Sequence, residues 1–206
     1  AGDPCQLPPT VISQEAERAG LGTTVFDRLT ARVKTKAQNK QHDKQQSDAW
    51  TLLHCMLEVQ HRMHESLMFF PSESKYEGRL IASPEVAQHV LQDLLNVQPD
   101  PLRPGPLVFI DTAGKGWNDE RLGTQTAKKP GDDPSIQNPG SAARAAAEVF
   151  RLISRGVSPK EIALITPYDA QARALRQILA SVLPQGLEVG TIDGFQGREK
   201  EAIVLD

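Results

Sequence analysis

Short apolar runs alternate with amphipathic helical segments through the last third of the chain, and this alternation restricts the possible folds more than any other feature. The apolar runs lie at 162–165, 188–192 and 202–205. A helix is predicted at 142–154, and Asp169 is placed to cap another helix before the second run. Apolar strands that alternate with helices predict an α/β fold, in which helices cover both faces of a mostly parallel sheet.

The first half of the chain gives weaker signals. We expect a helical stretch at 13–29 that breaks near Gly20 and Gly22. The Lys- and Gln-rich tract at 30–47 has almost no large apolar residue, so it is either a solvated helix or a polar insertion, and we prefer the insertion. The remaining predictions are a buried strand at 52–59, a short helix at 67–70, a helix from Ser83-Pro84 to about 95, a strand at 107–110 and a surface loop at 114–140.

Composition argues against several classes of protein. The 206 residues carry a net charge of −3, so nucleic-acid binding requires a local groove rather than a generally basic surface. No apolar run approaches the roughly 20 residues that span a bilayer, and we expect no membrane partner. Cys5 and Cys55 lie far apart, which favours a reducing intracellular compartment, the nucleus or the cytoplasm. No metal site is expected, because the nearest candidates match no usual zinc spacing: His54, Cys55, His61 and His64.

Polar residues directly follow three of the predicted strands, at 60–64, 166–168 and 193–199. The carboxyl ends of parallel strands meet at one edge of a sheet, and ligands of α/β folds bind at that edge. These segments are therefore candidates for a shared ligand site. For 193–199, the alternative interpretation is a charged surface turn.

The residue types in these segments suit a nucleotide. Arg62 and Arg198 offer guanidinium groups that match phosphate. The Gly197 amide can approach an oxyanion, and the Glu199 carboxylate can accept from ribose hydroxyls. The chain has no GxxxxGK[ST] sequence, so the groups that wrap phosphate and hold Mg²⁺ must come from another domain or be absent.

Several motifs occur in the order and the strand context of helicase motifs III, IV and V: Gly2-Asp3-Pro4-x-Gln6-Leu7-Pro8-Pro9, Gln60-His61-Arg62-Met63-His64, and Thr191 to Glu199. On these motifs the chain resembles the superfamily 1B helicases, most of all those of the immunoglobulin-mu-binding-protein type. It is also similar to the nonsense-mediated-decay RNA helicases. The resemblance covers nearly the whole chain outside 30–47, and it implies a RecA-like sheet of the P-loop NTPase type.

The resemblance implies a role for each matching residue. Gln6 is implied to couple the γ-phosphate of ATP to the second RecA-like domain, and Arg62 to act as an arginine finger in phosphoryl transfer. Gly197 and Glu199 correspond to γ-phosphate and ribose contacts. The implied cofactors are ATP and Mg²⁺, with the magnesium ligands in the first domain. The residues implied to contact a single strand are Thr166, Pro167, Tyr168 and Thr191.

Alternatives stay open for several of these residues. Arg62 could pair with a structural carboxylate, Glu199 could be a surface charge, and Tyr168 could serve packing alone. Two positions also depart from the family pattern. His61 stands where the family usually has tyrosine, and Ser141 stands where related chains often have glutamate.

The order of the motifs predicts the domain organisation. We expect 1–29 to be the end of a first RecA-like domain, 30–50 a polar insertion or linker, and 51–206 a second RecA-like domain that is incomplete at its C-terminus. The resemblance implies an ATP-dependent, 5′-to-3′ translocase on single-stranded DNA or RNA that acts as a monomer, although this chain alone should not hydrolyse ATP. The alternatives are a helicase-like scaffold without catalysis and a plain nucleic-acid-binding protein.

Overall fold

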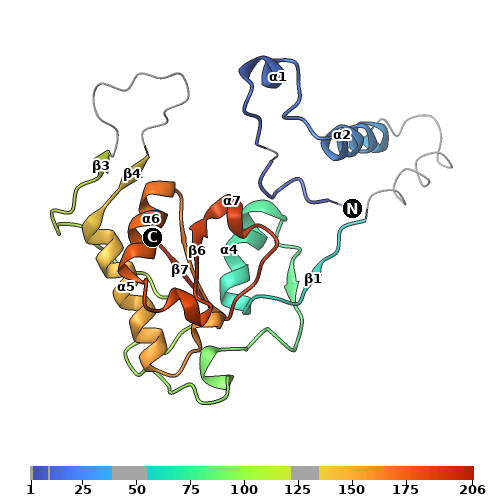
Figure 1. The fold of residues 1–206 in the computed structure, drawn as a ribbon. Helices are drawn as coiled ribbons and strands as arrows, with labels where there is room; N and C mark the ends of the chain where they lie inside the picture. Colours follow the sequence, from blue (N-terminus) through green and yellow to red (C-terminus); the bar gives the residue numbers. More distant parts are fainter. Residues whose placement is uncertain (1, 9, 39–54, 122–134) are drawn as a thin grey trace. The chain divides into compact units, whose positions relative to one another are not determined.

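The computed structural model describes residues 2–8, 10–38, 55–121 and 135–206 (Figure 1). The contacts divide the chain into two compact units. The first unit comprises Ala1–Gln60 and Pro71–Ile81, and the second comprises His61–Phe70 and Ala82–Asp206. Within the described ranges, none of the helices is both long and apolar enough to cross a membrane.

The second unit is built on a three-stranded parallel sheet in the order β6-β5-β7. Its strands are β5 (Ile162–Thr166), β6 (Glu188–Thr191) and β7 (Ala202–Leu205). In the register, Leu164 of the central strand pairs with Val189 on one side and with Val204 on the other. The prediction of three parallel strands from the apolar runs is therefore confirmed.

Two helices pack on this sheet and form the core with it. α5 (Pro139–Ser154) and α6 (Asp169–Ile178) contact each other and the central strand, which confirms both predicted helices. The prediction that Asp169 caps α6 is wrong, because Asp169 is its first helical residue and Tyr168 stands at the cap. Asn138 starts α5 by accepting a hydrogen bond from the Ser141 amide at 3.0 Å. The largest fully buried side chains are Ile162, Leu164, Leu175, Leu179, Val149 and Thr166. Each buried aliphatic side chain of this size contributes about 1.5–3 kcal/mol to the free energy of unfolding.

The opposite face of the sheet is covered only in part. Ala163 in β5 is fully buried, so the central strand is enclosed on both sides. Ile203 and Leu205 in β7 are 52% and 75% exposed. Ala202, at the start of the same strand, is buried and belongs to the core. The prediction that helices cover both faces is therefore wrong at β7 among the residues described.

The helix predicted from Ser83 to about 95 is wrong. Only a turn forms after Ser83, and a short 3-10 helix, η1 (Leu91–Asp93), follows. The helix stops because the Ala87 carbonyl accepts from the Glu65 amide at 3.1 Å, instead of from an amide further along its own segment. Val90 is extended, and its amide donates to the Asp93 carboxylate at 2.9 Å. Tertiary hydrogen bonds thus override the local helix signals.

Two predicted strands are also wrong. The run 107–110 has no strand partner among the described residues, and Leu107 and Phe109 are 69% and 89% exposed. Of the described residues 55–59, Val59 alone lies in a strand, β1 (Val59–Gln60), and Leu57 is 85% exposed. Residues 52–54 of that prediction lie outside the described ranges.

The predicted surface loop at 114–140 contains a short hairpin-like pairing. β3 (Glu120–Arg121) pairs with β4 (Ile136–Gln137) in an antiparallel arrangement. Residues 122–134 lie outside the described ranges. The loop also ends earlier than predicted, because Pro139 already belongs to α5.

The first unit contains the N-terminal helices. α1 (Gln14–Arg18) starts at Ser13, whose hydroxyl accepts from the Ala16 amide, and α2 (Val25–Gln38) follows. The predicted break near Gly20 is confirmed. However, α2 continues through the polar tract to Gln38, so the solvated helix rather than the preferred insertion describes 30–38; residues 39–47 lie outside the described ranges.

Two elements from the middle of the chain complete the fold. α4 (Glu65–Lys75) includes and extends the short helix predicted at 67–70. β1 pairs with β2 (Ile81–Ala82), and the Ile81 amide donates to the Glu58 carbonyl at 2.7 Å.

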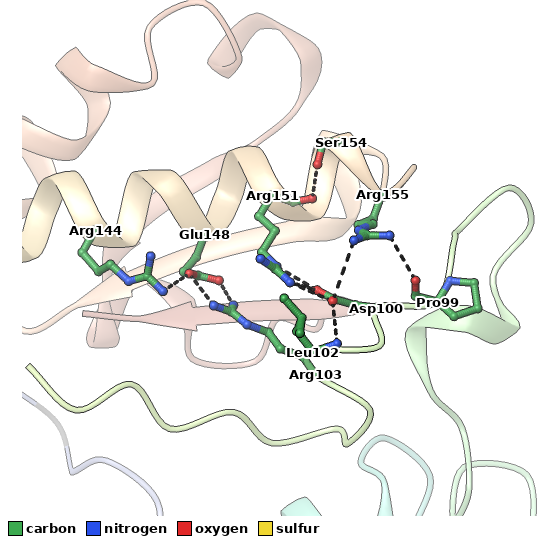
Figure 2. Close-up of polar contacts among 9 residues, drawn as sticks. All are labelled: Pro99, Asp100, Leu102, Arg103, Arg144, Glu148, Arg151, Ser154 and Arg155. Carbon is green, nitrogen blue, oxygen red and sulfur yellow. Dashed lines mark hydrogen bonds and ion pairs between the residues drawn. The ribbon is translucent and has the colours of Figure 1, made fainter.

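Ion pairs fasten the segment 99–103 to α5 (Figure 2). Arg151 donates two hydrogen bonds of 2.7 Å to the Asp100 carboxylate, and this arginine lowers the pKa of Asp100. Arg103 bonds in the same way to Glu148, whose side chain is only 8% exposed and which also pairs with Arg144. These contacts hold an otherwise irregular segment against the helix (Figure 2).

Candidate nucleotide and nucleic-acid site

Two predicted nucleotide residues from distant parts of the sequence meet in the second unit. Arg62 precedes α4, and Glu199 precedes β7. The Nε atom of Arg62 lies 3.0 Å from the Oε2 atom of Glu199, and the two side chains are 55% and 70% exposed. An ion pair this exposed contributes about 0–1 kcal/mol, so a competing anion can open it at low cost.

Gly197 lies in the loop that carries Glu199. Its φ angle is +83°, in the left-handed region that side chains rarely adopt, and no heavy atom lies within 4 Å of the position a Cβ would take. The backbone at Gly197 is therefore accessible to a ligand, and glycine is the residue type that this conformation favours.

Arg198, the second candidate arginine, is engaged within the unit. Its Nη1 atom lies 2.5 Å from Glu188 Oε2, and its guanidinium lies 5.6 Å from the centre of the Phe195 ring. Lys200 binds the other oxygen of the same carboxylate at 2.8 Å. Hydrogen bonds from Lys200 and then from Arg198 lower the pKa of Glu188. Arg198 thus balances Glu188, and Arg62 is the arginine beside Glu199.

The residues predicted to contact a nucleic acid end β5 and β6 or directly follow β5. Thr166 and Thr191 are paired in register at the carboxyl ends of these strands. Pro167 is exposed and Tyr168 is 46% exposed, whereas Thr166 is only 1% exposed and its buried hydroxyl has no hydrogen-bond partner. Of Thr166, Pro167 and Tyr168, only Pro167 and Tyr168 have exposed side chains in this structure.

Thr191 lines a hollow of about 440 Å³ beside β6. α7 (Ile192–Phe195) places Phe195 at its wall, where the ring lies 3.0 Å from the position of a Cβ on Gly190. Arg176 of α6 forms part of the wall and donates hydrogen bonds of 3.2 and 2.7 Å to the Val189 carbonyl. Phe195 lies within the motif match from Thr191 to Glu199 but was given no role there, and Arg176 belongs to no motif match.

Gln6 lies in the first unit, where Asp3 organises its loop. The Asp3 carboxylate accepts from the Gln6 side chain at 2.9 Å, from the Tyr76 hydroxyl at 2.7 Å and from the Cys5 amide at 3.0 Å. Burial opposes ionisation of Asp3, but these hydrogen bonds outweigh it and lower the pKa of the carboxyl. Burial and the Asp3 hydrogen bond raise the pKa of Tyr76. Asp3 belongs to the motif III match in the sequence, but no role was predicted for it.

Metal-binding side chains do not gather in the part of the chain that the structure describes. No group of three or more His, Cys, Asp or Glu residues is arranged there to hold an ion. Cys55 is a free, exposed thiol, and the His61 ring pairs at 3.7 Å with the exposed Glu85. His54 lies outside the described ranges.

A family model for the AAA domain matches residues 29–206, most of the chain. The chain belongs to the AAA domain family. It is 39% identical over its whole length to DNA-binding protein SMUBP-2 of Mesocricetus auratus, and 35% identical to DNA polymerase alpha-associated DNA helicase A of Schizosaccharomyces pombe. Over 99% of its length it is 33% identical to the Regulator of nonsense transcripts 1 homolog of Drosophila melanogaster. These similarities confirm the resemblance to the superfamily 1B helicases.

This AAA domain chain spans only a small part of those relatives. It covers 18% of the hamster protein, 27% of the fission-yeast protein and 15% of the fly protein. The similarity therefore concerns one segment of proteins that are several times longer.

Proposed function

We propose that this chain is the second, RecA-like motor domain of an ATP-dependent helicase that moves 5′-to-3′ on single-stranded DNA or RNA. The observation that carries the proposal is the contact between Arg62 and Glu199, beside the open backbone of Gly197. The family match and the helicase named among the relatives support the same function. The full-length protein acts as a monomer in the nucleus or the cytoplasm.

On the nucleotide side, Arg62 is the arginine finger. The γ-phosphate of ATP competes with the Glu199 carboxylate for the Arg62 guanidinium, and the exposed ion pair opens because it is worth little. Arg62 then stabilises the negative charge that develops on the transferred phosphoryl group. The freed Glu199 accepts from the ribose hydroxyls, and the Gly197 amide donates to phosphate.

The described residues of this chain suit ATP phosphate but not Mg²⁺. Arg62 and the Gly197 amide are donors of the kind that phosphate oxygens accept. The described residues hold no carboxylate cluster suited to an ion, so we assign the magnesium ligands to the first RecA-like domain of the full-length protein. ATP bound with Mg²⁺ supplies the phosphoanhydride bond whose hydrolysis drives stepping. Gln6, beside Asp3, is assigned to γ-phosphate sensing by the resemblance.

On the nucleic-acid side, Tyr168, Pro167 and Thr191 contact the strand, and Thr166 supports them from beneath. Contacts of this kind to the sugar–phosphate backbone need little sequence preference, which suits a protein that moves along a strand. One continuous segment leads from Thr191 through α7 to Gly197 and Glu199. This segment touches both ligands, so a change at the nucleotide is transmitted to the strand.

The proposal is tested in the full-length protein by measuring ATP turnover with and without single-stranded DNA and RNA. We expect turnover that rises with the strand, together with strand affinity that changes when a non-hydrolysable ATP analogue is bound. Strand affinity that is the same with and without nucleotide would favour a plain nucleic-acid-binding protein. The absence of both strand binding and turnover would favour a helicase-like scaffold.

A further inference from the structure

The half-buried carboxylate of Asp206 lies against Ser141. Ser141, which stands where related chains often have glutamate, donates its hydroxyl hydrogen to Asp206 Oδ1. Asp206 follows the last residue of β7, and Ser141 lies in the first turn of α5. The other oxygen, Asp206 Oδ2, accepts from the Gln171 amide at 2.6 Å. An acid is therefore present beside position 141, but it comes from the end of β7 and not from α5.

Gln171 connects this carboxylate to the starts of two helices. It lies in the first turn of α6 and is 5% exposed. Its Oε1 atom accepts from the Asn138 amide at 2.8 Å, and its Nε2 atom also donates to the Asn138 carbonyl at 3.3 Å. Asn138 is the cap of α5. A buried amide whose oxygen and nitrogen are both hydrogen-bonded fixes the groups around it.

Asp206 also holds the strand that leads into the Thr166–Tyr168 segment. Its backbone amide donates to the Ile165 carbonyl at 3.0 Å, directly before Thr166. Its carboxylate binds Gln171, three residues after Tyr168. One residue thus fixes both ends of the segment that carries Pro167 and Tyr168.

We propose that Asp206 is a positioning residue for the nucleic-acid segment Thr166–Tyr168, and that it supplies from β7 the carboxylate that related helicases often carry at position 141. The proposal rests on the proposed function, because it assumes that this segment contacts the strand. Asp206 does not touch the strand itself. It acts by holding Ile165 and Gln171, and therefore the chain between them, in one arrangement.

The direct contact between Ser141 and Asp206 makes a specific test possible. Asp206→Ser alone removes the acceptor of Gln171 and Ser141, leaving buried donors unpaired. Ser141→Glu alone brings a second carboxylate against Asp206, and like charges at this distance repel each other. The double variant S141E/D206S again has one carboxylate and one hydroxyl, so it should restore the arrangement. Such a cycle isolates the coupling between the two positions.

The experiment measures ATP turnover of the full-length protein over a range of single-strand concentrations, together with thermal unfolding of each variant. Each single variant should raise the strand concentration for half-maximal turnover about tenfold, because Thr166–Tyr168 is no longer held in its binding arrangement. The turnover rate at saturating strand should stay within about twofold of the wild-type rate. The double variant should return to within about threefold of the wild type. The matched control is Ser181→Glu, which adds the same charge at an exposed serine after α6 and should change neither value.

Distinct results separate the inference from the proposed function. A wild-type protein whose turnover ignores the strand overturns both. If the wild-type protein responds to the strand but the single variants need the same strand concentration for half-maximal turnover, the inference alone is overturned. It is also overturned if the double variant needs as much strand as the single variants. If Asp206→Ser does not fold, Asp206→Asn takes its place. It keeps an oxygen acceptor for Gln171, so an increase of about threefold is expected, and no increase overturns the inference.

Discussion

The Nε atom of Arg62 lies 3.0 Å from the Oε2 atom of Glu199, 137 residues further along the chain. Both residues were assigned to a nucleotide from their motifs, and the fold brings them into direct contact. Because each side chain is more than half exposed, the pair is a weak one that a phosphate group can replace. This relationship leads to two predictions about the loop that carries Glu199.

Glu199→Gln should leave stability almost unchanged and weaken nucleotide use. Loss of an exposed ion pair changes the free energy of unfolding by no more than about 1 kcal/mol. The amide accepts less strongly from ribose hydroxyls than the carboxylate, so the KM for ATP should rise about three- to tenfold. Denaturant unfolding and steady-state turnover of the full-length protein measure the two effects. An unchanged KM would remove Glu199 from the nucleotide site.

Gly197→Ala should reduce both stability and turnover. The φ of +83° disfavours any side chain, at a cost of about 1–2 kcal/mol, and the added methyl group occupies the open space where we place phosphate. The matched control is Gly194→Ala in α7, where the nearest atom to an added Cβ is 3.8 Å away and φ is not in the left-handed region. Equal effects of the two substitutions on the KM for ATP would contradict the assignment of Gly197.

Glu188 should make the folded protein sensitive to acid. Lys200 and Arg198 lower its pKa below the ordinary value of 4.5, so the folded state binds a proton less readily than the unfolded state. Its contribution to stability is therefore complete above pH 4.5 and is lost as the pH falls through the lowered value. Glu188→Gln should make the free energy of unfolding depend less steeply on pH below about 4.5. Denaturant titrations at several pH values measure this slope, and an unchanged slope would show that Glu188 does not contribute.

The ion pairs of Figure 2 should differ in strength according to burial. Arg103→Ala removes hydrogen bonds from the nearly buried Glu148 carboxylate, and should lower the free energy of unfolding by about 1.5–3 kcal/mol. Arg144→Ala removes a more exposed partner of the same carboxylate, one turn away on α5, and should cost about 0.5 kcal/mol. Chemical denaturation of the two variants provides the comparison. Equal losses would mean that burial of the pair does not determine its contribution.

Sequence patterns correctly predicted the helices and strands that are determined by the residues within them. The strands β5, β6 and β7 and the helices α5 and α6 follow directly from apolar spacing. The helix expected after Ser83 failed because the Ala87 carbonyl is taken by the amide of Glu65, 22 residues away in sequence. A strand at 107–110 failed because strand formation needs a partner, and local sequence does not reveal whether one is available.

The site shows the same division. Motif spacing singled out Arg62, Gly197 and Glu199 as candidate nucleotide contacts. It did not show that Arg198 would form an ion pair with Glu188 at the start of β6. Nor did it show that Asp206 would supply the acid missing at Ser141, since neither residue alone indicates the other.

Arg62→Ala in the full-length protein is the most direct test of the proposed motor function, with Arg173→Ala as the control. Arg173 is an exposed arginine of α6 that is paired with Asp169 in the same helix. Strand-stimulated ATP turnover should fall about a thousandfold or more in Arg62→Ala with no loss of folding, and stay near wild type in Arg173→Ala. Turnover near the wild-type rate in Arg62→Ala would contradict the arginine-finger assignment.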